Sequence, residues 1–158
     1  MTTEVLGVDV GGVLVDRIRA DGSDTSFFSD RFLETPAVAG AFDTLAFLSR
    51  ERFGQRICIV SKCGPKTEAK TRLWLAHHKL LDALRLDERA LHFCRERRDK
   101  APICKRLGVT HFIDDRMDVL THLKSVKHRF LFGPQEASVK SEGVMRTETW
   151  AEVAAALI

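Results

Sequence analysis

The sequence predicts an α/β fold: a three-layer, Rossmann-like arrangement in which helices cover both faces of one parallel sheet. Two observations indicate this. Short apolar runs such as Val5–Val10 and Arg56–Ser61 alternate along the chain with longer segments of helical periodicity. The runs are also continuously apolar, without the in-and-out alternation of a half-exposed strand, which is typical of strands buried on both faces of a parallel sheet.

The first apolar run, residues 5–10, ends at an acid and a Gly-Gly pair and is predicted to be a central strand. Residues 17–36 are more polar and are predicted to form a flap or loop insertion. Thr35 and Pro36 then suit the cap and the first position of a helix. Apolar residues at helical spacing extend this predicted helix over residues 36–52.

The rest of the chain continues the alternation of strands and helices. Gly54 ends the first helix, and Gly64-Pro65 separates the second strand from the second helix. The predicted elements from this point are strands at 56–61, 91–93, 110–113 and 129–132, and helices at 66–80, 99–107, 117–125 and 147–157.

Composition favours one ordinary globular domain spanning residues 1–158, with 44% hydrophobic residues in 158. The 25 Lys and Arg against 22 Asp and Glu give a net charge of +3, which excludes an acidic disordered tail and a densely basic DNA-coating protein. No apolar run approaches the roughly 20 residues that span a bilayer, and the first residues carry no basic leader. We therefore expect no membrane partner and a cytoplasmic location.

The four cysteines fit the same expectation. They are Cys58, Cys63, Cys94 and Cys104, and no two of them form a CxxC pair. Their apolar neighbours favour buried free thiols of a reducing compartment over a zinc site or a disulfide.

Polar side chains follow three of the predicted strands. Asp9 ends the first, Ser61 and Lys62 end the second, and Asp114 with Asp115 ends the strand at 110–113. The carboxyl ends of parallel strands meet at one edge of a sheet, where ligands of such folds bind. The sequence therefore predicts that these side chains converge on a single crevice.

The predicted chemistry follows from the residue types. Carboxylates about 4 Å apart repel by several kcal/mol at an effective dielectric near 20, and a hard divalent cation relieves that repulsion. Mg²⁺ binds through one or two carboxylates together with substrate phosphate. Ser61 and the amides after it can hold an anion, and Lys100 at the start of a basic helix is the natural lysine to neutralise it.

In this order the residues resemble the haloacid-dehalogenase-like (HAD) hydrolases. The strand ending at Asp9 is similar to the first motif of that superfamily, and Ser61 after an apolar strand is similar to the second. Lys100 is similar to the third motif, and Asp114-Asp115 at a strand end to the fourth. Each motif alone is unspecific, but four in the right order, over about residues 4–133, indicate the superfamily.

The resemblance implies a mechanism and a role for each residue. Asp9 would attack phosphorus and form an aspartyl-phosphate that water hydrolyses, with Ser61 and Lys100 also counted as catalytic. Mg²⁺ would be held by Asp9, the Gly11 carbonyl, Asp114 and Asp115. The transferring phosphate would be bound by Ser61, Lys62 and Lys100.

Two features depart from the superfamily pattern. Most of its phosphatases carry a second aspartate two residues after the nucleophile, as general acid and base, and here that position is Gly11. A positioned acid contributes about 10²–10⁴ in rate. The chain also has no room for a cap domain between Asp9 and Ser61, which resembles the capless phosphatases and implies an open site for bulky substrates or closure by another subunit, as in a homodimer.

The sequence is therefore consistent with three functions. The first is a Mg²⁺-dependent phosphohydrolase acting on a phosphorylated small molecule or nucleotide. The second is a phosphate- or nucleotide-binding protein that lost turnover with the acid at Gly11. The third is a nucleic-acid end phosphatase, since the stretches around Lys100 and Asp115 resemble those of 5'(3')-deoxyribonucleotidases and polynucleotide kinase-phosphatases.

Other residues near the motifs leave alternatives open. The arginines before Lys100 (Arg95, Arg97 and Arg98) either bind a further phosphate or lie on a solvated loop of mixed charge. Phe27 and Phe28 either stack on a base or pack against the domain. Asp118 either orients the metal ligands or only begins a helix.

Overall fold

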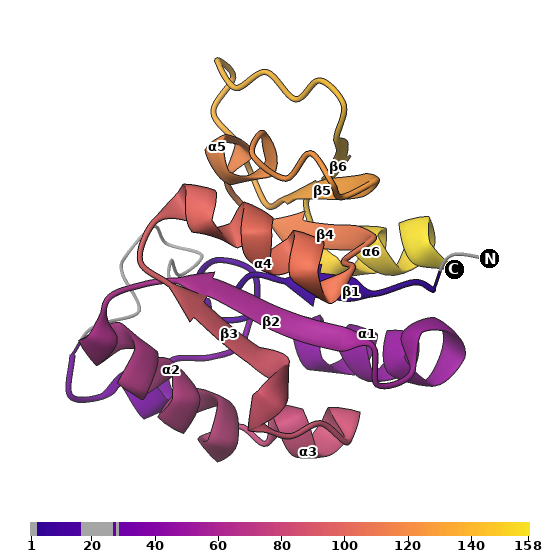
Figure 1. Ribbon diagram of the computed structural model, residues 1–158. Coiled ribbons are helices and arrows are strands. Elements are labelled where there is room, and N and C mark those ends of the chain that lie inside the picture. Colours follow the sequence, from indigo (N-terminus) through magenta and orange to yellow (C-terminus); the bar gives the residue numbers. More distant parts are fainter. Residues whose placement is uncertain (1–2, 17–26, 28) are drawn as a thin grey trace.

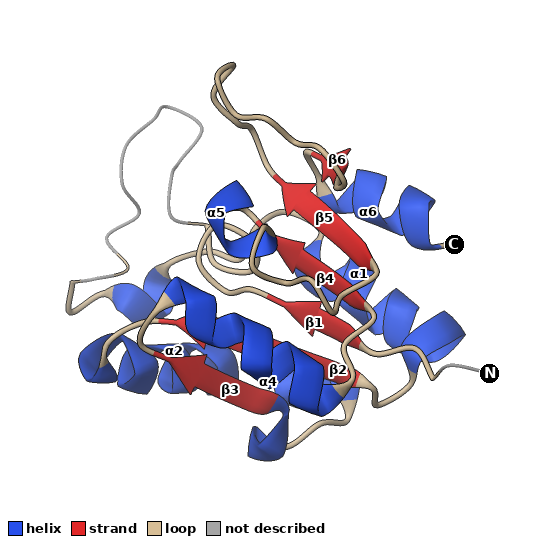
Figure 2. Ribbon diagram, turned by 45° about the horizontal axis from the view of Figure 1, so that its top comes forward, coloured by secondary structure: helices blue, strands red, loops and turns tan. Residues whose placement is uncertain are grey.

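A computed structural model of the chain describes residues 3–16, 27 and 29–158. It contains one six-stranded sheet in which all neighbouring strands are parallel, in the order β3-β2-β1-β4-β5-β6 (Figures 1 and 2). The strands are β1 (Leu6–Val8), β2 (Ile57–Lys62), β3 (Leu91–Cys94), β4 (His111–Asp114), β5 (His128–Phe132) and β6 (Met145–Thr147). The predicted α/β fold with a parallel sheet is confirmed.

Helices cover both faces of this sheet, as the alternating chain pattern predicts. The α-helices are α1 (Ala41–Leu48), α2 (Pro65–His77), α3 (Leu80–Leu84), α4 (Lys100–Leu107), α5 (Met117–Leu120) and α6 (Trp150–Leu157). Short helical turns lie at η1 (Phe32–Glu34), η2 (Ser49–Phe53), η3 (Glu88–Ala90) and η4 (Arg97–Asp99).

Two buried clusters define the three layers. Alternate strand residues such as Ile57 and Ile59 pack with α1, α2, α3 and α6, whereas Cys58 and Val60 point to the other face and pack with α4 and α5. Successive side chains of a strand point to opposite faces. A strand with a helical layer on each side must therefore be apolar at every position, which explains the continuous apolar runs.

The chain departs from the sequence prediction between Thr35 and Gly40. Thr35 ends the short turn η1 instead of beginning a helix, and α1 begins only at Ala41, after Gly40 in a left-handed conformation. The intervening residues pair with the loop after β1: Val38 donates to the Leu14 carbonyl, and Asp16 donates to the Pro36 carbonyl. This pairing uses backbone groups that a helix would otherwise have engaged. The helix predicted over residues 36–52 is thus shorter at its start.

The other differences lie at element ends. The helix predicted at 66–80 ends at His77, and a separate helix α3 follows Lys79, whose φ is 58°. The helix predicted at 117–125 keeps only Met117–Leu120. The helix predicted from 147 begins at Trp150, after the unpredicted edge strand β6, and is capped by Thr149, which accepts a hydrogen bond from the Glu152 amide.

Most of the predicted flap at 17–36 lies outside the described residues. Between β1 and α1 the part of the chain that the structure describes contains only the short turn η1 and isolated bridges. Within the described residues, no helix is both long enough and apolar enough to cross a membrane. All four cysteines are buried free thiols.

Candidate active site

The carboxyl edge of the sheet brings together the polar residues that follow β1, β2 and β4. They line a cavity of about 370 Å³. Its lining includes Asp9, Gly11, Ser61, Lys62, Lys100, Asp114 and Asp115. Every residue that the sequence assigned to the site therefore reaches this one cavity.

The first strand places Asp9 by backbone pairing. β1 is the central strand, flanked by β2 and β4, and the Asp9 amide donates to the Ile113 carbonyl at 3.0 Å. The side chain of Asp9 is almost fully buried, with 8% of the residue exposed. A carboxylate fixed by two neighbouring strands has little freedom to turn away from the cavity.

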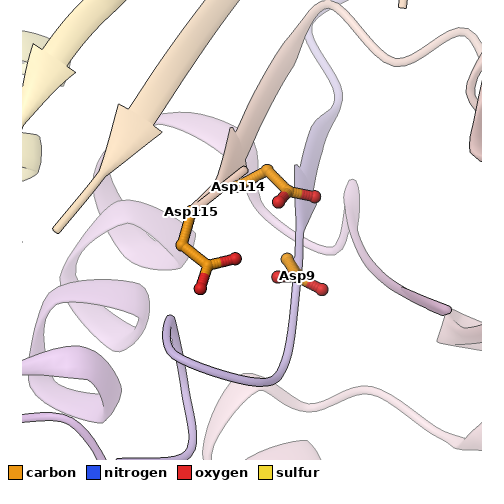
Figure 3. Close-up of side chains that lie close together, drawn as sticks. All are labelled: Asp9, Asp114 and Asp115. Atoms are coloured by element: carbon orange, nitrogen blue, oxygen red, sulfur yellow. The ribbon is translucent and has the colours of Figure 1, made fainter. Parts of the chain in front are cut away.

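The fourth strand supplies the second and third carboxylates. Asp114 is the last residue of β4 and is completely buried, and Asp115 follows it at the strand end. One oxygen from each of Asp9, Asp114 and Asp115 lies within 4.8 Å of the others, and in Figure 3 the three carboxylates face a shared space. This arrangement concentrates up to three negative charges in a partly buried site.

Lys100 is the only cation in contact with these carboxylates among the described residues. Its Nζ donates to Asp9 Oδ1 at 2.9 Å and to Asp114 Oδ2 at 2.8 Å, and the residue is 2% exposed. Burial alone would lower the pKa of Lys100, but Asp9 and Asp114 outweigh this effect and raise it. Lys100 therefore stays charged and holds the two carboxylates in place.

One lysine does not balance three carboxylates. Burial first, and then the charge of Asp9, raises the pKa of Asp114, although Lys100 and the Arg116 amide oppose this. Burial and the charges of Asp9 and Asp114 also raise the pKa of Asp115. The site therefore resists carrying its full negative charge, as expected where buried carboxylates outnumber the cations beside them.

The donor atoms fit a hard divalent cation. All three side chains offer carboxylate oxygens, which are the ligands that Mg²⁺ prefers, and they lie close enough for one ion to contact more than one of them. The backbone carbonyl of Gly11 belongs to a residue that lines the same cavity. Asp9, Asp114, Asp115 and Gly11 are thus a suitable ligand set.

Gly12 makes the position of Asp115 possible, a role that the sequence analysis did not assign. Its φ is +80°, a backbone conformation that residues other than glycine rarely adopt. A Cβ built on Gly12 would overlap the Asp115 carboxylate. In the sequence, only the Gly-Gly pair after Asp9 pointed to a close contact here, and it did not show that the side chain packed against Gly12 is that of Asp115.

The second strand and the helix after it supply further residues that line the cavity. Ser61 is 6% exposed in β2, and Lys62 is exposed at its end. Thr67 and Thr71 of α2 also line the cavity, and the Thr71 hydroxyl donates to the Thr67 carbonyl at 2.8 Å. The sequence analysis missed these two threonines, because nothing in a helical pattern shows which face meets a cavity.

The structure separates the remaining candidates. Phe27 is buried, lines the cavity and contacts the Phe32 ring edge-on, which leaves little of it to stack on a base; Phe28 lies outside the described residues. Asp118 forms ion pairs with Arg116 and Arg97 and does not contact the three carboxylates. Of the three arginines before Lys100, only Arg97 lines the cavity.

Comparison with known proteins yields a structural similarity. No protein-family model and no curated protein sequence matches the chain. A solved structure, described as a HAD family hydrolase from Deinococcus radiodurans R1 with bound phosphate and sodium, is similar with a TM-score of 0.60 and 15% sequence identity. The match covers 99% of this chain and 95% of that chain. At this identity the similarity establishes the fold alone: the protein has a HAD-like fold.

Proposed function

We propose that the protein is a Mg²⁺-dependent phosphohydrolase that cleaves a phosphomonoester through an aspartyl-phosphate intermediate. The observation that carries this proposal is the arrangement of Asp9, Asp114 and Asp115 around Lys100, in a cavity at the carboxyl edge of a HAD-like sheet. The phosphate and sodium bound by the structurally similar hydrolase are consistent with it. The substrate is a phosphorylated small molecule or nucleotide.

In this mechanism Asp9 is the nucleophile. One of its carboxylate oxygens attacks phosphorus, the bond between phosphorus and the leaving oxygen breaks, and that oxygen keeps the electron pair. Water then attacks the same phosphorus and releases phosphate and free Asp9. Burial and the hydrogen bond from Lys100 orient the carboxylate for both steps.

Lys100, Ser61 and Lys62 stabilise the phosphoryl group. Lys100 is fixed by Asp9 and Asp114, so its charge is in place before substrate arrives and needs no reorganisation as negative charge develops. Ser61 supplies a hydroxyl and Lys62 a second cation on the cavity wall. Mg²⁺, held by Asp9, Asp114, Asp115 and the Gly11 carbonyl, would neutralise charge on the phosphoryl oxygens.

Gly11 restricts which substrates can turn over rapidly. It lines the cavity, and by the resemblance of the motifs it occupies the place, two residues after the nucleophile, where most HAD phosphatases carry their general acid; glycine has no group that donates a proton. Esters with good leaving groups need no such acid, so we expect the rate to fall steeply as the leaving group becomes more basic. Within residues 3–16, 27 and 29–158 no cap domain covers the cavity, which favours a site that admits a bulky leaving group.

The test is release of phosphate from an activated aryl phosphate, with and without Mg²⁺, beside the Asp9→Asn variant. We expect activity that requires Mg²⁺ and falls at least about 10³-fold in the variant, because the amide is not a nucleophile. Circular dichroism checks that Asp9→Asn is folded, because a variant of a proposed Mg²⁺ ligand is itself expected to bind Mg²⁺ more weakly.

Gly11 is also the observation that favours a second candidate, a phosphate-binding protein without turnover. In that case the wild-type protein would bind Mg²⁺ and phosphate but release no more phosphate from the ester than Asp9→Asn does. The variant Gly11→Asp separates the two functions further. Under either hypothesis it should release phosphate faster than the wild-type protein, but the wild-type protein itself is active only if it is an enzyme.

A further inference from the structure

We infer that the cavity contains a second anion-binding subsite, formed by Arg97 and Arg116, for a carboxylate or phosphate carried on the leaving group of the substrate. The inference rests on the proposed phosphohydrolase function, because the first subsite must hold the reacting phosphate. It narrows the substrate class to phosphomonoesters that carry a second anionic group.

Arg97 and Lys100 line the cavity from the same helical segment, Arg97 near the solvent and Lys100 deep inside. Arg97 belongs to η4, which continues directly into α4 at Lys100, so the two side chains are one helical turn apart. Residues three apart on a helical segment are neighbours on one face. Both residues line the cavity, but Lys100 is 2% exposed whereas the Arg97 side chain is 42% exposed.

Arg116 lines the same cavity and directly follows Asp115 in the chain. Its Nε and Nη2 donate to the two oxygens of Asp118 at 3.0 and 2.9 Å, which fixes the guanidinium in one orientation. The same carboxylate lies 3.7 Å from Arg97 Nη1. Asp118 thus holds two guanidinium groups side by side while neutralising only one positive charge.

The neighbouring arginines do not share this position. Arg95 donates to the Cys63 carbonyl at 2.8 Å and to Glu68 at 3.0 Å, and Arg98 pairs with Glu96 at 2.8 Å. Neither lines the cavity. In contrast, the pair to Asp118 at 3.7 Å is the single polar contact of the Arg97 side chain among the described residues. Most of its donors are therefore free for a ligand.

The volume and charge of the cavity support a ligand larger than phosphate. Its volume of about 370 Å³ lies within the range of roughly 300–1,000 Å³ that small-molecule sites occupy. Lys62, Arg97 and Arg116 line it beyond the carboxylate cluster, and Asp118 beside the two arginines offsets one of their charges. Arg116 also borders an adjacent, larger hollow of about 1330 Å³, which gives the leaving group room to extend.

Calorimetric binding of non-hydrolysable phosphonates, at a fixed free Mg²⁺ concentration, tests the inference without requiring turnover. The probes are propylphosphonate, 3-phosphonopropionate, which adds a carboxylate, and 1,2-ethylenediphosphonate, which adds a second phosphonate. We expect both probes with a second anionic group to bind about tenfold more tightly than propylphosphonate, as charge-assisted contacts to guanidinium predict. The probe with the larger gain identifies the second anion as carboxylate or phosphate.

The matched variants are Arg97→Gln and Arg98→Gln, which remove the same charge one residue apart, inside and outside the cavity. Arg97→Gln should abolish most of the tenfold gain and leave propylphosphonate affinity within about twofold, whereas Arg98→Gln should preserve the gain. The double variant Arg97→Gln/Arg116→Gln should remove it entirely. Circular dichroism checks that each variant is folded.

Three results would overturn the inference. Equal affinity of wild-type protein for the three probes means that no second subsite exists. An equal loss in Arg97→Gln and Arg98→Gln means that general charge, not the cavity, attracts the second anion. Failure of every phosphonate to bind removes the phosphate site itself, and then the proposed function and the inference fail together.

Discussion

The two ends of the central strands carry charged clusters of different kinds. At the amino end, Glu4 accepts hydrogen bonds from Arg52 at 2.9 and 2.7 Å, and Arg52 also donates to the Leu157 carbonyl. At the carboxyl end, Asp9, Asp114 and Asp115 lie close together, and Lys100 pairs with the first two of them. Glu4 precedes β1 and Asp9 follows it, so each cluster connects one end of β1 to other elements of the fold.

The difference lies in how the charges balance. At the amino end one carboxylate meets one guanidinium, and the hydrogen bonds from Arg52 hold the pKa of Glu4 down at about 2. At the carboxyl end three carboxylates meet one lysine, and burial with mutual repulsion raises the pKa of Asp114 and Asp115. The first cluster is complete within the chain. The second has more carboxylates than cations, which is why we propose function at that end.

The largest effect is expected from removing Lys100. Lys100→Met leaves Asp9 and Asp114 buried without their cation, so we expect a loss of about 3 kcal/mol in the free energy of unfolding, together with loss of phosphate release. Mg²⁺ should restore part of the stability. Urea unfolding with and without Mg²⁺ measures both.

Arg52→Met is the matched substitution at the other end of the sheet. Arg52 and Glu4 are partly exposed, so this variant should lose only about 1 kcal/mol, and Mg²⁺ should stabilise it as much as the wild-type protein. Equal losses in Arg52→Met and Lys100→Met would contradict the contrast between the two ends.

The next expected effect is that the increase in protein stability on adding Mg²⁺ depends on pH. Burial and neighbouring carboxylates raise the pKa of Asp114 to about 7 and of Asp115 to about 8, from an unfolded value near 3.8. A raised carboxyl pKa contributes stability below the unfolded value that is lost as pH rises through the folded value. The metal-free protein should therefore lose stability from these groups as pH rises toward 8.

In the proposed site Mg²⁺ would bind the ionised carboxylates, so its stabilising effect should grow over the same pH range. At a hundredfold excess over the dissociation constant it reaches about 2.7 kcal/mol. Thermal denaturation at a series of pH values, with and without Mg²⁺, checks this. Asp115→Asn is the control, and its Mg²⁺ effect should depend less on pH; a wild-type effect that shrinks as pH rises would contradict the assignment.

A smaller effect is expected from Gly12→Ala. The new Cβ would overlap the Asp115 carboxylate and strain a backbone whose φ is +80°. Displacement of one ligand should weaken Mg²⁺ binding about tenfold, as disturbance of groups around a metal commonly does. Gly108→Ala is a control for the strain alone, because its φ is +68° and nothing lies within 4 Å of the position that the new methyl group would occupy. Calorimetric titration with Mg²⁺ of both variants separates the effect of backbone strain from that of displacing Asp115.

The last effect belongs to the amino end and leaves the proposed site untouched. Burial first, then His128 and Arg52, lower the pKa of His111 to about 4, and its ring stacks on His128 at 4.4 Å. A lowered histidine pKa contributes stability above the unfolded value near 6.5 that is lost as pH falls toward 4. His111→Phe should flatten this part of the stability profile, measured by urea unfolding between about pH 4 and 7, without changing Mg²⁺ affinity.

Much of the fold could be predicted because its signals are local. Five of the six strands were predicted from short, mainly apolar runs. The signal is clearest for the inner strands β1 and β2, which are apolar on both faces because a helical layer covers each face. β6 escaped prediction because it is a short edge strand of Met145–Thr147, with two of its three residues exposed. The segment before Gly40 escaped because its backbone partners, Leu14 and Asp16, are distant in sequence.

The sequence by itself determined the parallel α/β architecture and the residue types at the strand ends. Strand burial leaves an apolar pattern; the acids and Ser61 lie at the ends of strands that this pattern reveals, and Lys100 lies at the start of a predicted helix. Only the tertiary structure decided which side chains share a space: that Lys100 bridges Asp9 and Asp114, that Gly12 makes room for Asp115, and that Arg97 lines the cavity while Arg98 does not. The physical reason is that distances between separate elements depend on packing and register, which no local pattern encodes.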